Sequence, residues 1–579
     1  MNDRLRFLLT VLAVVIIFAF RFNEYKKHAT TSFDLTEFKN KSIIRCSPDW
    51  NELKDWLEET SIPPIPGAGI YKWKIFTKND SAQFYFNQGI NMYYSFHIIE
   101  AMASFKKAAR FDEKCGIIYW AQALAYGPNI NDFGYRSSPG ALEAVKKAMD
   151  NAGYTPIEKG LIHAISLRYS EDSSQTREKL NEDYVTAMKQ LYKDLNTDPD
   201  VAALYADAMM LQHPWDLWNI DGTPKPWTPL IREVLEKVLA KTPMHPGANH
   251  YYIHVMEPSP FAAKALSSAD RLGKTNPGLS HVVHMPSHIY LRTGLYNKAV
   301  DVNINAVNSY KRSIPLYAPV TGADFLYIIH NLHMKTNNAM LAGNYKIAEA
   351  AALETRNSIP IDYLSIPAPM GSYVQYIYMT PVLVNVRFGK WDKLLQEKQP
   401  DASRVYANIL YHFGRGMALA NTKKITEAKK ELDEMKILIA DTSLLIPFTP
   451  FSSAIDGAMV ASKLLSGTIA LKENNINTAI IDFSGAAFIE QNMVYNEPRD
   501  WLLSPKHFLG NAYLLKGEDV NAEKTFSADL DNNSENGWAL YGLYKALLLQ
   551  KKTTLAAKVL ARQKAAFAKA DITITSTVY

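Results

Sequence analysis

Histidines gather in one short stretch of this 579-residue chain. Histidine occurs only 14 times, and even spreading would place about two of them between residues 250 and 333. That window instead holds seven: His250, His254, His281, His284, His288, His330 and His333. Imidazole is a common ligand for zinc, copper and iron, and it also titrates near neutral pH. The clustering therefore predicts either a metal site or acid–base chemistry.

The spacing of these histidines places them on one face of a helical array. At 100° per residue, His281, His284 and His288 fall within about 60° of each other on a helix. When the flanking segments are aligned on their small and apolar positions, His250 and His254 take equivalent places, and so do His330 and His333. Three successive repeats are therefore predicted to present histidine to the same concave groove.

Three explanations of this face remain open. In the first, His250, His254, His284 and His288 bind one or two transition-metal ions (Zn, Fe or Cu), with His330, His333 and His281 as further ligands. Glu257 would then be a ligand, a general base or a partner that orients an imidazole. In the second, a metal-free polar pocket binds an anion or performs acid–base chemistry. In the third, the histidines are hydrogen-bonded structural residues.

A proline- and tryptophan-rich stretch precedes the histidines. The run HPWDLWNIDGTPKPWTP, residues 213–229, contains prolines and an Asp-Gly pair that exclude a helix and predict an ordered loop. Trp215, Trp218 and Trp227 are predicted either to form a lid over the groove or to act only as an aromatic plug of the insertion.

The elements that carry these residues are predicted to be tetratricopeptide-type repeats. Gly89, Gly467 and Gly510 are each followed by Ala 12 residues later and by Phe 16 residues later. Gly416, with Ala428 and Leu432, fits the same frame. The small residues allow two helices to approach closely, and the large residue fills the space beside them. We expect an all-α, right-handed α-solenoid of about ten helix–turn–helix units.

The N-terminus has a different character. A charge-free run at residues 7–20, flanked by basic residues, is typical of a signal-anchor or a signal peptide within residues 1–27. We expect residues 28–79 to be a linker or extension, followed by N-terminal repeats at 80–240, histidine-rich repeats at 241–357 and C-terminal repeats at 358–579. The chain would then be exported to the cell envelope, on the outer side of the inner membrane. In that compartment Cys46 and Cys115 are expected to form a disulfide.

Charge gives no support to nucleic-acid binding. The chain has 63 basic and 58 acidic residues and a net charge of +5, without a dense basic block beyond the N-terminus.

Several long motifs resemble a family of bacterial, exported tetratricopeptide proteins. The stretches are FNQGINMYYSFHIIEAMASFKKAARFDEKCGIIYWAQALAYGPN, HPWDLWNIDGTPKPWTP, HPGANHYYIH, HVVHMPSHIYLRTGLYNKAV and HNLHM. The resemblance implies a shared site at His245, His250, His254, His284, His288, His330 and His333, and it also implies export and the disulfide. It supplies no reaction.

Two functions are therefore expected. One is a metal-binding protein or metalloenzyme that is membrane-anchored through residues 7–20 or secreted. If it is an enzyme, the residues do not distinguish a metal-dependent oxidoreductase from a hydrolase. The other is a non-catalytic scaffold whose groove binds a peptide or protein partner.

Overall fold

The computed structural model describes residues 48–579 except 49, 60, 133–134, 136, 152–153 and 318–322. The apolar run 7–20 and Cys46 lie outside the described residues, so the membrane anchor and the disulfide stay predictions. Cys115 is buried at the start of α6.

The described part of the chain is helical, and its single β-bridge joins Trp218 to Pro224. The helices before the histidine-rich region are α3 (Trp50–Glu59), α4 (Asp80–Tyr93), α5 (Ile98–Phe111), α6 (Gly116–Ala125), α7 (Pro139–Asp150), α8 (Pro156–Ser166), α9 (Arg177–Asp194), α10 (Pro199–Gln212) and α11 (Thr228–Lys241). Between α3 and α4 lies a non-helical segment, 61–79, which packs Ile62, Trp73 and Ile75 into the core.

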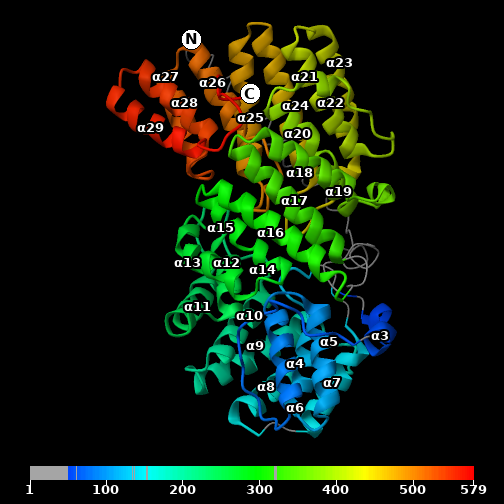
Figure 1. Cartoon of the computed structure of the whole chain (residues 1–579). Helices are drawn as coiled ribbons and strands as arrows, with labels where there is room; N and C mark the ends of the chain where they lie inside the picture. Colours follow the sequence, from blue (N-terminus) through cyan, green and yellow to red (C-terminus); the bar gives the residue numbers. More distant parts are fainter. Residues whose placement is uncertain are drawn as a thin grey trace, which may run out of the picture. The chain divides into compact units, whose positions relative to one another are not determined.

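The histidine-rich region and the rest of the chain continue the same architecture (Figure 1). The central elements are α12 (Pro246–Met256), η1 (Ala262–Ala265), α13 (Leu266–Thr275), α14 (Ser280–His284), α15 (Pro286–Arg292), α16 (Tyr296–Ser313), α17 (Ala323–Leu341) and α18 (Tyr345–Asn357). The later elements are η2 (Ile361–Ser365), α19 (Met370–Tyr378), α20 (Thr380–Arg387), α21 (Trp391–Leu395), α22 (Val405–Asn421), α23 (Ile425–Ile439), η3 (Thr442–Leu445), α24 (Ala454–Lys472), α25 (Ile476–Gln491), α26 (Pro505–Lys516), α27 (Asp519–Leu530), α28 (Gly537–Leu549) and α29 (Thr553–Ala566).

Successive helices pack against each other as hairpins, and each hairpin packs on the next. This arrangement confirms the predicted all-α, tetratricopeptide-type α-solenoid. The clearest hairpins are α4/α5, α22/α23, α24/α25, α26/α27 and α28/α29.

The glycine and phenylalanine of the repeat pattern meet inside the hairpins. A Cβ atom added to Gly89 would lie 2.4 Å from the Phe105 ring, and one added to Gly467 would lie 2.5 Å from the Phe483 ring. Gly510 and Phe526 repeat the contact at 2.5 Å. The aromatic ring of the second helix therefore occupies the space that a side chain on the glycine of the first helix would need.

One described helix, α24, is long and apolar enough to cross a membrane by length and composition. It packs against α22 and α25, and 61% of its apolar window is buried. It is thus built as a core helix of its hairpin.

Two interruptions of the regular array shape the site. Pro286 lacks an amide hydrogen and divides residues 280–292 into α14 and α15. After α25, residues 492–504 form an irregular segment before α26 begins.

Candidate metal centre

Helix α12 presents two of the histidines, and its start is fixed by a third. His245 caps the helix, because its Nδ1 accepts a hydrogen bond from the amide of Ala248, and Pro246 follows at the first helical position. The other ring nitrogen of His245 lies 3.2 Å from Asp200 Oδ1. His245 is therefore a structural cap, and His250 and His254 follow it one turn apart.

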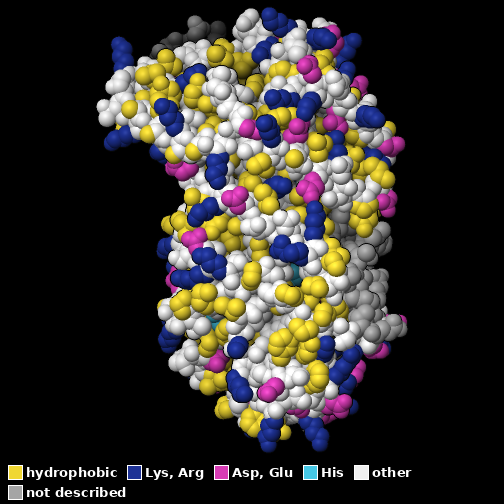
Figure 2. Space-filling model, viewed as in Figure 1, with side chains coloured by type: hydrophobic (Ala, Val, Ile, Leu, Met, Phe, Trp, Pro, Cys, Tyr) yellow, Lys and Arg dark blue, Asp and Glu magenta, His cyan; other side chains and the backbone are white. Residues whose placement is uncertain are grey.

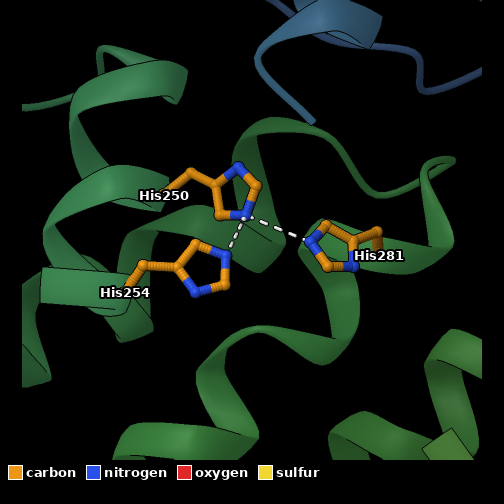
Figure 3. A group of neighbouring side chains, drawn as sticks. All are labelled: His250, His254 and His281. Carbon is orange, nitrogen blue, oxygen red and sulfur yellow. Dashed lines mark hydrogen bonds between the residues drawn. The ribbon is translucent and has the colours of Figure 1, made fainter. Parts of the chain in front are cut away.

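The first histidine trio consists of His250, His254 and His281. The Nε2 atom of His250 lies 3.1 Å from Nε2 of His254 and 3.1 Å from Nε2 of His281 (Figure 3). Helix α14 supplies His281, and α12 supplies the other two.

The second histidine trio consists of His284, His288 and His330. The Nε2 atom of His284 lies 2.7 Å from Nε2 of His288 and 3.0 Å from Nε2 of His330. These residues come from α14, α15 and α17, so the broken helix at Pro286 contributes to both trios.

Hydrogen-bond partners fix the proton of two rings on the outward nitrogen. His250 Nδ1 lies 2.7 Å from the carbonyl oxygen of Tyr94, which only accepts hydrogen bonds. His284 Nδ1 lies 2.6 Å from Asn303 Oδ1, whose amide nitrogen donates to Ala299. The proton of each ring therefore sits on Nδ1, and an unprotonated Nε2 with its lone pair faces the centre of each trio.

Glu257 joins the two trios. Its Oε1 lies 2.9 Å from His254 Nδ1, and its Oε2 lies 3.0 Å from His288 Nδ1, although the second contact is not aligned as a hydrogen bond. Glu497 Oε2 contacts the same Nδ1 of His288. Both Glu257 oxygens thus face imidazoles. This geometry fits a role in orienting the rings better than it fits the role of a general base.

Burial keeps the imidazoles neutral. Desolvation is the main cause that lowers the pKa of His250, His288 and His330 to about 3, and it lowers the pKa of His254, His281 and His284 well below the usual value. Neutral imidazole is the form that binds a metal ion. Burial also raises the pKa of Glu257.

The histidine face of the predicted concave groove is buried, because other segments pack on it. His250 is 0% exposed, His254 2% and His281 6%. Phe96, between α4 and α5, packs on all three rings, with centroids 4.4, 5.8 and 5.6 Å away. Glu497, from the irregular segment after α25, contacts His288 of the second trio. On the face drawn in Figure 2, histidine is accordingly almost absent, and acidic and basic side chains are interspersed.

Of the predicted tryptophan lid, one residue reaches the site. The Trp215 ring meets the His254 ring edge-on at 5.4 Å and also contacts Phe451. Trp218 donates to the carbonyl of Val255, and Trp227 stacks on His213 at 3.5 Å. The last two tryptophans pack the ordered loop, which ends where α11 begins at Thr228.

His333 is not brought into either trio. It lies on α17 one turn from His330, it is 2% exposed, and its ring packs edge-on against Tyr376. Neither of its ring nitrogens has a hydrogen-bond partner among the described residues.

Three contributors to the site escaped the sequence analysis. Glu497 lies more than 200 residues beyond His288 in an irregular segment, and Tyr94 acts through its backbone. Asn303 lies on the neighbouring helix α16, and only its position in the repeat could have indicated from the sequence that it contacts the site.

The fold and site define an all-α tetratricopeptide-type array that encloses a histidine-rich centre. No protein-family model and no curated protein matches the sequence, so membership of the exported bacterial family stays a prediction. Solved structures with a similar course include a human IFIT1 dimer with m7Gppp-AAAA, at 9% identity and a TM-score of 0.31, covering 93% of this chain and 96% of that one. Yeast Tom70 follows at 12% identity and a TM-score of 0.29, covering 83% and 92%. Likenesses this distant carry no inference about ligands or partners.

Proposed function

We propose that this protein binds transition-metal ions through its two histidine trios, one ion in each. The observation that carries the proposal is the convergence of three Nε2 atoms in each trio. The outward nitrogens of His250, His254 and His284 are held by protein acceptors. The lone pairs of His250 Nε2 and His284 Nε2 each face two further ring nitrogens, and a cation at the centre of a trio would bind all three nitrogens at once.

The distances fit this role. Four ligands at 2.0–2.1 Å around a tetrahedral zinc ion lie about 3.3 Å from one another. The nitrogens of the first trio are separated by 3.1 Å along two edges, close to that spacing. Only a small outward movement of the rings would admit an ion.

The ligand set favours a site that does chemistry over a purely structural one. Three protein ligands per ion leave a coordination position open for water or a substrate, whereas structural zinc sites are closed by four protein ligands. We therefore infer a metalloenzyme. An all-imidazole set suits zinc, copper and iron, and the chemistry is hydrolytic with zinc and oxidative with copper or iron.

Elemental analysis of the full-length protein tests the proposal. The protein is purified without chelators or a metal-binding tag, then offered Zn, Cu and Fe separately, and the bound metal is measured by mass spectrometry. We expect two equivalents in the wild type. His250→Ala/His254→Ala and His284→Ala/His288→Ala should each lose one of them.

A matched control separates specific binding from general histidine binding. His163 is an exposed histidine on α8, and His163→Ala should keep both equivalents. Circular dichroism should show the same helicity for all variants. No metal in the wild type, or equal metal content in the double variants and the control, would refute the proposal.

Burial of the histidine face weighs against the scaffold alternative at this place. An extended peptide needs an open groove, whereas Phe96 and Trp215 cover the first trio. A partner protein would therefore have to bind elsewhere on the array.

We further propose that the chain is exported and anchored by residues 7–20, because that run is apolar, uncharged and flanked by basic residues. Protease treatment of intact spheroplasts should then digest the helical array. Full protection of the array would place it on the other side of the membrane.

A further inference from the structure

A second polar site lies beside the metal centre. A pocket opens between the central and C-terminal hairpins, and the residues that give it its character are Arg292, Asn337, Arg387, Glu490, Arg499 and Asn532. Arg292 lies one turn beyond His288 on α15, and Asn337 lies two turns beyond His330 on α17. The pocket therefore shares its walls with the second histidine trio.

Two of the three arginines lack a carboxylate partner. Arg292 donates to the carbonyl oxygens of Asn532, at 2.9 Å, and Ser259, at 3.3 Å, and its buried Nε has no partner. Arg387 donates to the carbonyl of Val578 and approaches His507 Nδ1 at 3.1 Å. In the part of the chain that the structure describes, neither guanidinium is within ion-pairing distance of an acid.

Two acidic groups near the pocket, Glu490 and Asp529, are paired with other side chains. Glu490, the one acid of the lining, pairs with Arg499 at 2.6 Å and has Lys506 at 3.7 Å. Asp529 is bound to His507 at 3.0 Å, so it meets Arg387 only through that ring. The lining itself carries three arginines and one acid, while Glu257 and Asp529 act electrostatically on Arg292 and Arg387 from outside it. An excess of positive charge in the lining favours a bound anion.

We infer that this pocket binds a small oxyanion with a carboxylate or phosphate group. Guanidinium groups present paired donors that match the two oxygens of such a ligand, and the amide of Asn337 adds a neutral donor. The ligand would supply the directly contacting anionic group that Arg292 lacks among the described residues.

The pocket adjoins the metal centre, but anion binding in the pocket does not require the metal. Tyr495 and Asn496 line the pocket, and the next residue, Glu497, contacts His288. Because the arginines supply the charge, the anion is expected to bind with the metal present or removed. A failure of the metal proposal would therefore leave this inference standing, and the reverse also holds.

Isothermal titration calorimetry on the full-length protein tests the inference. Inorganic phosphate and succinate are titrated separately in a buffer that contains neither, so that the two arms distinguish the phosphate from the carboxylate ligand. We expect one of them to bind at a single site, and Arg292→Gln to weaken that binding at least about tenfold.

Two further variants make the result decisive. Asn337→Leu removes a pocket donor while keeping side-chain size, and it should also weaken binding. It therefore tests the inference even if Arg292→Gln fails to fold. Arg312→Gln, an exposed arginine at the end of α16, should leave binding unchanged. No binding of either anion, or equal affinities for Asn337→Leu and Arg312→Gln, would overturn the inference.

Discussion

Glu257 is the residue on which the two halves of the centre depend. It is fully buried, and each of its oxygens approaches the Nδ1 atom of a histidine in a different trio. A carboxylate behind a ligating imidazole fixes its orientation and raises its basicity. Glu257 therefore links the two proposed metal sites through the histidines that it contacts.

Replacing this carboxylate should damage metal binding without removing a ligand. Glu257→Gln keeps one acceptor oxygen, so only one of His254 and His288 can keep its contact with residue 257, and His288 still has Glu497 beside it. We expect metal affinity at one trio to fall about 10- to 100-fold. Competition with a chromophoric chelator measures the change.

The control for this substitution lies close by. Glu236 accepts a hydrogen bond from Tyr252 on the outer side of α12, so Glu236→Gln should leave affinity unchanged. An equal loss in both variants would assign the effect to helix packing rather than to the centre.

His333 offers the opposite test, because the structure keeps it out of the trios. His333→Leu removes two buried nitrogens that have no hydrogen-bond partner, so unfolding free energy should stay equal or rise by about 1–3 kcal/mol. Metal content should stay at the wild-type level. A loss of metal would show that His333 is a ligand, as the sequence predicted.

The same residue gives a pH dependence. Burial lowers the pKa of His333 to about 3, from about 6.5 in the unfolded chain. The unfolded state thus takes up a proton below pH 6.5 while the folded state does not, and stability is lost as pH falls from 6.5 toward 3. His333→Leu should reduce this loss by about 2 kcal/mol at pH 5. Urea unfolding of the metal-free proteins at pH 7 and pH 5 measures it.

At the scale of helices, the repeat pattern was enough to predict the fold. The spacing from Gly89 to Phe105 and from Gly467 to Phe483 encodes a contact within one hairpin, and such local contacts leave a periodic trace in the sequence. The same periodicity placed His250, His254, His284, His288 and His330 on one face, and the structure brings them together.

The rest of the site could not be predicted because it depends on contacts without a period. Phe96 and Glu497 reach the histidines from irregular segments far away in the sequence, and they turn an expected groove into a buried centre. The division into two trios begins on α14, where His281 and His284 are three residues apart and contact different partners, and the break at Pro286 places His288 on α15.

Hairpin packing makes a prediction of its own. Gly89→Ala would place a methyl group 2.4 Å from the Phe105 ring and should destabilise the protein by about 1–3 kcal/mol. Gly273→Ala, on α13, meets only Pro286 at 3.9 Å and should be neutral or stabilise by up to about 1 kcal/mol. Thermal unfolding of both variants compares them, and equal effects would contradict the packing account.

At the scale of the whole chain, the centre should tie several repeats together. Its ligands come from α12, α14, α15 and α17, with Glu497 added from the segment after α25. Because each repeat otherwise contacts mainly its neighbours, metal should stabilise these elements most. Hydrogen exchange measured by mass spectrometry should show loss of protection in them after chelation. Uniform change that extends equally to α28 and α29 would argue against a local centre.

The most direct test of the central claim is to locate the ions. Crystals of the metal-loaded protein, measured on both sides of the absorption edge of the metal, should show two anomalous peaks. One should lie about 2.0–2.1 Å from the Nε2 atoms of His250, His254 and His281, and the other at the same distance from those of His284, His288 and His330. Peaks only at other residues, or none at either trio, would contradict the account.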